Sequence, residues 1–227
     1  MSTIINRTKT YLRTSFMASV VLAVGAPTVV LTAGTLVAPS VVRADEGPSK
    51  HISGIFDQVK TIVTANKDKV SEEETDNQLK KIIVPMFDFD EMSQRSLGAY
   101  WEKATPEERK EFVDLFSDLL ARTYLKRIKR NAESSKIASM TDEISGEKAM
   151  VRSSVVTDGE EISLDYRLLH EGGEWKIYDV IIENVGLVSN YRNEFPGIIR
   201  KEGFSGLLTR LRNKQISQAG IPTGGKH

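Results

Sequence analysis

Cysteine is absent from the 227-residue chain, and histidine occurs only three times. The absence of cysteine excludes disulfide bonds, thiol catalysis, cysteine-based metal sites and a lipid anchor on an N-terminal cysteine. His51, His170 and His227 are far apart, and no His-Glu-x-x-His spacing occurs. A phosphate-binding loop, a dinucleotide fingerprint and a Gly-x-Ser-x-Gly motif are missing as well. We therefore expect no metal site and no cofactor.

Asp and Glu are absent from the first 44 residues, and residues 16–42 carry no charge at all. Three basic residues precede this small and apolar stretch, which ends at Arg43-Ala44 before two acidic residues. These features are typical of a secretory signal peptide, so we expect residues 1–44 to be removed by cleavage after Ala44. A retained membrane anchor is the alternative, because the uncharged run is long enough to span a bilayer.

Cleavage would change the charge balance of a chain that has 31 basic and 31 acidic side chains. Four of the basic residues lie in the first 44 positions, so 27 basic and 31 acidic residues would remain, a net charge of about −4. This charge argues against nucleic acid as a partner. We expect a single domain over residues 45–214, followed by a flexible polar tail over 215–227.

Helical patterns dominate the first part of this domain. Apolar spacings of three and four predict a helix over 50–66, and Ser71 predicts the cap of a second helix that ends at Pro85. Asp88 could cap a short third helix. The clearest start is Thr105-Pro106-Glu107-Glu108, a capping box with Pro at the first helical position, opening a helix to about residue 130.

From about residue 135 the apolar period changes from helical to two. Residues 136–144, 147–157, 162–168 and 175–182 are predicted to be four strands, separated by turn signals such as Asp158-Gly159. A last amphipathic region, 187–211, is expected to be interrupted at Pro196-Gly197. Helices, then strands, then helices indicate an α+β fold with a four-stranded antiparallel meander sheet.

Two polar residues are candidates for catalysis. Asp179 interrupts the apolar fourth strand, and a structural carboxylate bonded to backbone or to an Arg is the favoured interpretation over a catalytic acid. His170 could form a dyad with Asp165 or Asp179, but its position beside a Glu-Gly-Gly turn favours a surface histidine.

Three strings of sequence, in the same order as in a known family, are more informative. Residues 97–109 read LGAYWEKATPEER, residues 173–188 contain WKIYDV followed by ENVGLV, and 190–195 and 203–211 resemble C-terminal family helices. Together they resemble the MlaC/toluene-tolerance family of periplasmic phospholipid-binding proteins over most of residues 50–214. Asn184 departs from the usual Gly, and Ser189 lies two residues later than the usual Ser.

The resemblance implies a sheet of the NTF2-like or cystatin-like kind, wrapped by N- and C-terminal helices that enclose an apolar cavity for acyl chains. It also implies a periplasmic, non-enzymatic shuttle of phospholipid between an inner-membrane ABC transporter complex and an outer-membrane lipoprotein complex. We expect a monomer. The family includes carriers linked to hopanoids, so another lipid is an alternative cargo.

Large apolar residues on the expected inner faces are the predicted lining of the cavity: Phe89, Leu97, Trp101, Phe112, Phe116, Tyr166, Ile177, Val188, Tyr191, Phe195 and Phe204. A small exported enzyme with a sheet-lined pocket and an interaction module with a filled core are the competing hypotheses. The basic cluster Lys126–Arg130 is a candidate docking surface, although a solvated helix end is the favoured interpretation.

Overall fold

The computed structural model describes residues 47–216, so the expected signal segment and residues 217–227 of the expected tail lie outside the described residues. Helices precede and follow a single sheet, in the order that the sequence predicts. The elements are α1 (Pro48–Asn66), α2 (Glu72–Ile83), the 3₁₀ turn η1 (Val84–Met86), α3 (Phe89–Leu97), α4 (Ala99–Lys103), α5 (Pro106–Asn131), β1 (Lys136–Ser145), β2 (Lys148–Thr157), β3 (Glu160–Glu171), β4 (Glu174–Ile182), β5 (Val185–Gly186) and α6 (Leu187–Arg212).

The predicted helix caps are confirmed. The Ser71 hydroxyl accepts a hydrogen bond from the Glu74 N–H, and Asp88 caps α3 in the same way. At α5 the Thr105 Oγ1 accepts from the Glu108 N–H at 3.2 Å, while the Glu108 Oε2 accepts from the Thr105 N–H at 2.9 Å. These bonds satisfy N–H groups that have no partner inside a helix, and so they define where each helix begins.

The strands form one antiparallel meander in the order β1-β2-β3-β4-β5. The α+β prediction is confirmed, with a fifth strand added to the expected four. β5 has two residues, which is too short to show an apolar period. It follows a tight turn at Glu183 and Asn184, both with positive φ. The Asp158-Gly159 turn also has positive φ at both positions, as a two-residue hairpin turn requires.

The prediction that Pro196-Gly197 interrupts the last helical region is wrong. α6 continues through Pro196, and the backbone leaves helical geometry at Gly203, with φ 74° and ψ 175°. Proline fixes φ near the helical value and removes one donor, so a helix with enough packing around it can contain a proline. The Gly203 conformation is available almost only to glycine.

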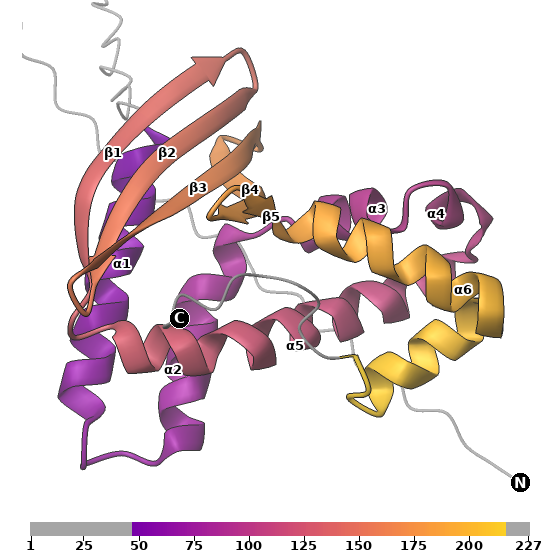
Figure 1. Ribbon diagram of the computed structural model, residues 1–227, viewed down its shortest axis with the longest axis horizontal. Coiled ribbons are helices and arrows are strands. Elements are labelled where there is room, and N and C mark those ends of the chain that lie inside the picture. The colour runs from indigo at the N-terminus through magenta and orange to yellow at the C-terminus, as the bar shows by residue number, and fades with distance from the viewer. Residues whose placement is uncertain (1–46, 217–227) are drawn as a thin grey trace, which may run out of the picture. The chain divides into compact units, whose positions relative to one another are not determined.

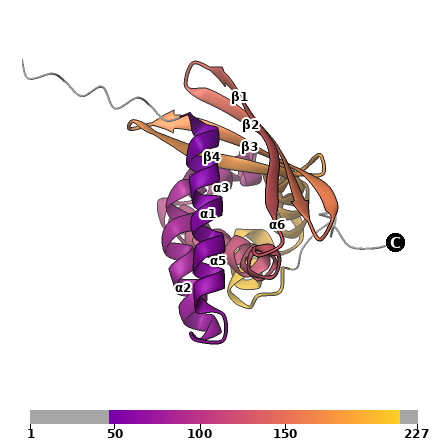
Figure 2. The same ribbon diagram turned by 90° about the vertical axis from the view of Figure 1, so that its left-hand side faces the viewer.

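Figure 1 shows α1 beside β1 and β2, near the C-terminal end of α5, while α3, α4 and α6 are grouped near its N-terminal end. In Figure 2 α1 and the C-terminal end of α5 lie on the same side of the sheet. α5 therefore connects two packing regions, one at the sheet and one at α6. Among the helices of residues 47–216, none is both long and apolar enough to cross a membrane.

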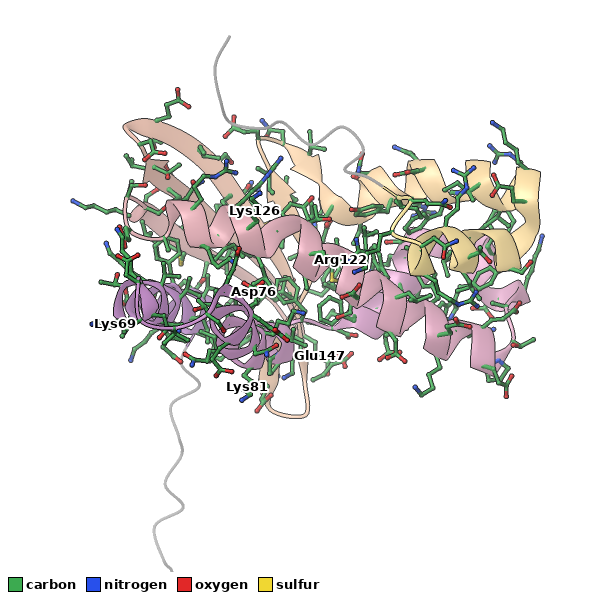
Figure 3. The ribbon with its side chains drawn as sticks, turned by 90° about the horizontal axis from the view of Figure 1, so that it is seen from below. Lys69, Asp76, Lys81, Arg122, Lys126 and Glu147 are labelled. Atoms are coloured by element: carbon green, nitrogen blue, oxygen red, sulfur yellow. The ribbon has the colours of Figure 1, made fainter. Side chains whose placement is uncertain are left out.

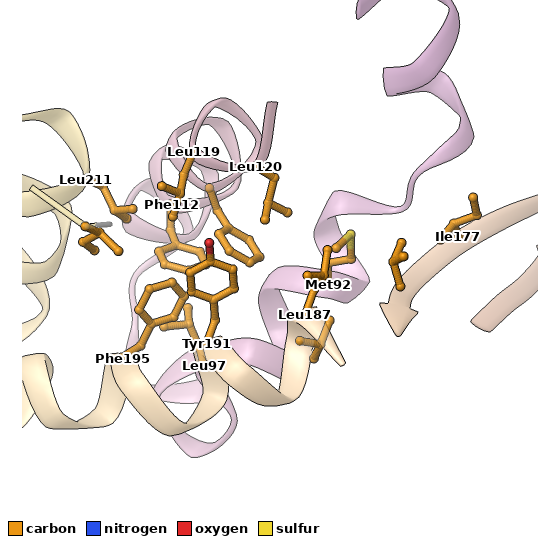
Figure 4. Packing of buried hydrophobic residues seen from close by; sticks show 14 of the residues in the cluster. Met92, Leu97, Phe112, Leu119, Leu120, Ile177, Leu187, Tyr191, Phe195 and Leu211 are labelled. Atoms are coloured by element: carbon orange, nitrogen blue, oxygen red, sulfur yellow. The ribbon is translucent and has the colours of Figure 1, made fainter. Parts of the chain in front are cut away.

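The buried apolar residues form two separate clusters. The first joins α3, α5, α6 and the sheet, and its centre is the packing of Phe112, Tyr191 and Phe195 (Figure 4). The second lies between α1, α2 and the C-terminal half of α5, and consists of Val59, Leu79, Leu125 and Ala132. A main core with a smaller satellite is usual in a domain, and Ile55 packs against both clusters, so the feature of interest is the space between them.

Candidate functional site

A cavity of about 730 Å³ lies between β2–β4 of the sheet and helices α1, α2 and α5. This volume is within the range of pockets that hold small ligands. Its walls draw residues from both apolar clusters. Ile52, Met92 and Ile177 belong to the first cluster, and Val59 and Leu125 belong to the second. The cavity therefore lies where the two parts of the core face one another.

Helix α5 contributes to the core and to the cavity with different halves. In its N-terminal half, Phe112 lies 5.5 Å from the Phe195 ring, and Phe116 lies 5.1 Å from the Tyr191 ring. In its C-terminal half, a different set faces the cavity: Leu120, Ala121, Tyr124, Leu125 and Ile128. The same apolar stripe thus packs against α6 at one end and borders open space at the other.

Two phenols lie on the apolar wall of the cavity, those of Tyr124 and Tyr166. Burial raises the pKa of the Tyr124 hydroxyl, and burial also raises the pKa of the Tyr166 hydroxyl. Both phenols therefore stay neutral at physiological pH. The wall they belong to carries no ionised phenol, which suits an apolar occupant.

Ionisable side chains lie at the edge of the cavity. Arg127 and Arg130 come from the end of α5, while Asp158, Glu160 and Glu183 come from the turns that follow β2 and β4. The lining is thus mostly apolar, and most of its charges lie where it reaches solvent; the half-buried Lys80 of α2 is a further charged lining residue.

The structure brings together only part of the predicted lining. Phe89, Tyr166 and Ile177 line the cavity. Six others are buried in the first cluster and are not among the cavity-lining residues: Leu97, Phe112, Phe116, Val188, Tyr191 and Phe195. Trp101 and Phe204 pack against that cluster from outside. Contact of any of these residues with lipid stays a prediction.

Sequence reasoning missed the contribution of α1 and part of the contribution of β3. Ile52, Ile55 and Val59 line the cavity from α1, and Ile162 and Leu164 line it from β3. The 3.6-residue and two-residue apolar periods place these residues on inner faces, but neither period tells a filled core from an open one.

Asp179 is a structural carboxylate, as predicted. It is 2% exposed, and its Oδ1 accepts the Val188 N–H at 3.0 Å. Arg167 donates to Oδ2 at 3.2 Å. Burial raises the pKa of the Asp179 carboxyl, although these two partners act in the opposite direction. The carboxylate ties β3 and β4 to the first turn of α6.

His170 is half-buried, so the expectation of a surface histidine is wrong. Its ring lies 4.8 Å from the Trp175 ring, and Trp175 is its partner across the β3–β4 pair. Asp179 pairs with Arg167, three positions away along β3, which corresponds to roughly 10 Å at about 3.4 Å per residue. The proposed dyad of His170 with Asp179 is therefore not assembled. Within residues 47–216, no group of three or more His, Asp or Glu could hold a metal ion.

The basic residues of the cluster Lys126–Arg130 point to different parts of the molecule. Lys129 reaches α2, where its Nζ lies 2.8 Å from Glu72 and 2.5 Å from Asp76. Figure 3 shows Asp76 on α2 and Lys126 on the neighbouring α5. Arg127 and Arg130 belong to the cavity edge instead. A docking role for this cluster stays a prediction.

Known proteins share this architecture and this sequence pattern. Residues 54–213 match the sequence model of the MlaC protein family. The chain is 23% identical to the intermembrane phospholipid transport system binding protein MlaC of Haemophilus influenzae, over 74% of this chain and 82% of that protein. It is 24% identical to the toluene tolerance protein ttg2D of Pseudomonas putida, over 73% of this chain and 79% of that protein.

One solved structure combines the fold with a bound ligand. It is a phospholipid-binding protein from Ralstonia solanacearum in complex with a phospholipid. The two structures have a TM-score of 0.67 and 29% sequence identity, over 73% of this chain and 95% of that one.

Proposed function

The chain belongs to the MlaC family, and on that premise we propose that it is a periplasmic carrier that holds phospholipid acyl chains in the cavity between its sheet and its helices. The observation that carries the proposal is the division of the apolar core around a cavity of about 730 Å³. Open apolar space costs stability, because its lining loses packing contacts. An occupant with apolar chains would restore them.

Acyl chains need such a carrier in an aqueous compartment. At about 0.8 kcal/mol per CH₂ group, exposing one 16-carbon chain to water costs on the order of 13 kcal/mol. Two chains double that cost, so free diffusion of phospholipid is negligible. A protein that shields the chains removes most of this barrier and needs an apolar lining, which the cavity has.

The related proteins support phospholipid as the cargo. The Ralstonia protein binds phospholipid, and the Haemophilus protein is the binding component of an intermembrane phospholipid transport system. We extend this to transfer between an inner-membrane ABC transporter complex and an outer-membrane lipoprotein complex, by a monomer exported through residues 1–44. A hopanoid remains the alternative cargo.

The competing functions have less support. An interaction module would have a filled core, and the cavity argues against it. An exported enzyme would need catalytic groups, and the two candidates have structural contacts instead. Asp179 accepts hydrogen bonds from Val188 and Arg167, and the His170 ring packs on Trp175. No observation favours catalysis over carriage.

The test is to purify the exported protein under native conditions, extract it with organic solvent and identify the extracted lipids by mass spectrometry. We expect phospholipid to co-purify with the protein, and we expect the delipidated protein to take up phospholipid from vesicles. Absence of both co-purifying lipid and uptake would overturn the proposal. Hopanoid as the main extracted lipid would replace the cargo and keep the carrier.

A further inference from the structure

We propose that the mouth of the cavity selects phospholipids with a zwitterionic head group, a phosphate joined to an ammonium group, over phospholipids with an anionic head group. This inference rests on the proposed function, because it concerns the head group of a lipid whose chains occupy the cavity. It goes further by naming the residues that would distinguish one phospholipid from another.

The mouth can be located from the exposure of the lining residues. Arg130, Asp158, Glu160 and Glu183 are exposed, and every other lining residue is buried or half-buried. All four are ionisable. The cavity therefore reaches solvent at a rim that carries charges of both signs, and a lipid with its chains inside would place its head group there.

The fold brings the two signs of charge together. Arg127, Arg130 and Asn131 lie on one face of the last turn of α5, at spacings of three and four. Beyond this turn, the Ser134 and Thr157 hydroxyls lie 3.3 Å apart. Thr157 is the residue before the Asp158-Gly159 turn, so the end of α5 lies next to the acidic residues of that hairpin.

Three of these charges have no ion-pair partner among the described residues. Within residues 47–216, Arg130, Asp158 and Glu160 take part in no ion pair. Glu183 differs, because its Oε1 accepts the Ser163 N–H at 2.5 Å. Opposite charges at one rim but beyond contact distance leave room for a ligand with complementary charges between them.

A zwitterionic head group matches this arrangement. A guanidinium presents paired N–H donors that suit phosphate oxygens, and a carboxylate accepts hydrogen bonds from an ammonium group. The rim has two arginines and three carboxylates. A head group that has the phosphate but no ammonium leaves these carboxylates without a partner, so the discrimination comes from an attraction that only the zwitterionic head group can make.

The experiment uses vesicles that contain equal amounts of phosphatidylethanolamine and phosphatidylglycerol with identical acyl chains. Both lipids share one bilayer, so the surface charge of the vesicle is common to them. Delipidated protein is incubated with the vesicles and re-isolated, and its lipids are quantified by mass spectrometry. We expect ethanolamine lipid in about threefold excess or more, the scale of one or two exposed ion pairs.

The double variant Asp158→Asn/Glu160→Gln should bring this ratio close to one by lowering the uptake of the ethanolamine lipid, because the ammonium group loses its carboxylate partners. Asn suits the positive φ of position 158, so the turn is kept. The matched control, Glu73→Gln/Glu107→Gln, removes two exposed carboxylates at the starts of α2 and α5, away from the cavity. It should keep the wild-type ratio.

Arg130→Gln should lower the uptake of both lipids, because both carry the phosphate. Glycerophosphoethanolamine, which has the head group but no chains, should not compete, which separates lipid recognition from binding of a free phosphate ester. Equal uptake of the two lipids by the wild type, an unchanged ratio in the double variant, or an equal fall in the control overturns the selectivity. Uptake of neither lipid overturns the carrier itself.

Discussion

Asp179 is the residue on which the junction between sheet and C-terminal helix depends. Its carboxylate satisfies the Val188 N–H at the start of α6 and accepts from Arg167 on β3. Gly186 lies so close that a Cβ there would be 3.1 Å from the Asp179 Oδ2. A short polar side chain and a glycine together therefore allow β5 to lead directly into α6.

Replacing Asp179 with Ala should destabilise the protein by about 2 to 3 kcal/mol. The buried Val188 N–H would lose its partner, which costs about 1 to 3 kcal/mol. The Arg167 side chain is 44% exposed, so its ion pair adds little. Urea denaturation measures the difference. Asp179→Asn is the control, since its Oδ1 can still accept from Val188, and it should lose less. Equal losses would show that the backbone bond is unimportant.

The same carboxyl gives a pH dependence with a definite sign. Burial raises its pKa above the usual value of 3.8. The folded state therefore binds a proton more readily than the unfolded state, and the resulting stability is complete below pH 3.8 and is lost as the pH rises through the folded pKa. Wild type should gain stability relative to Asp179→Asn as the pH falls from 7 to 4. A constant difference in urea midpoints across this range would contradict the raised pKa.

The role of Asp179 could be predicted from sequence because a lone charge in an apolar strand has few stable solutions. Its partners could not. Val188 and Arg167 become neighbours of Asp179 only through the β3–β4 register and the tight turn into α6. The sequence offered no signal for that turn beyond Asn184, which has the positive φ that Asn tolerates better than most residues.

At the scale of the element, α6 is the helix whose geometry the sequence did not reveal. Pro196 is the stronger breaker in a pattern-based analysis, yet the kink lies at Gly203. Packing of Tyr191 and Phe195 against α5 stabilises the helix on the N-terminal side of Pro196. Tertiary contacts therefore outweigh the local preference, and a pattern that lacks those contacts cannot rank the two breakers.

Gly203→Ala should destabilise the protein by about 1 to 3 kcal/mol, because a Cβ is strained at φ 74° and ψ 175°. Gly197→Ala is the matched control in the same helix. Its nearest neighbour would be an Arg200 nitrogen 3.9 Å away, so it should be neutral or stabilising by up to about 1 kcal/mol. Thermal or urea unfolding of the pair separates the two positions. If both variants have the same stability, the backbone conformation at position 203 does not require glycine.

Helix α5 shows why the elements were predictable and the site only in part. Its capping box and apolar period defined its start and its inner face correctly. The period treats Phe112 and Tyr124 alike, yet Phe112 is packed against α6 and Tyr124 lines the cavity. The difference depends on which element faces each turn of the helix, and that is a property of the whole fold.

At the scale of the whole molecule, the candidate site is a region without packing, and sequence patterns describe only packing. Six predicted lining residues fill the first cluster, where α3, α5 and α6 meet. The cavity lies instead between the sheet and the pair α1–α2. Family resemblance indicated that a cavity exists, while its position required the placement of α1 relative to the strands.

If the cavity holds acyl chains, a variant whose cavity is filled by a side chain should be more stable than the lipid-free wild type and should bind less lipid. Ala121 is a small residue on the cavity wall of α5. Ala121→Phe should stabilise the lipid-free protein by on the order of 1 kcal/mol, because the ring buries apolar area in open space, and it should lower lipid uptake from vesicles. Ala138→Phe adds the same ring at an exposed position on β1 and should change neither quantity. Thermal unfolding of delipidated protein measures the first effect, and lipid per protein after vesicle incubation measures the second. A variant that loses stability would show that the cavity wall is tightly packed at Ala121. A variant that keeps full uptake would place the acyl chains elsewhere in the molecule.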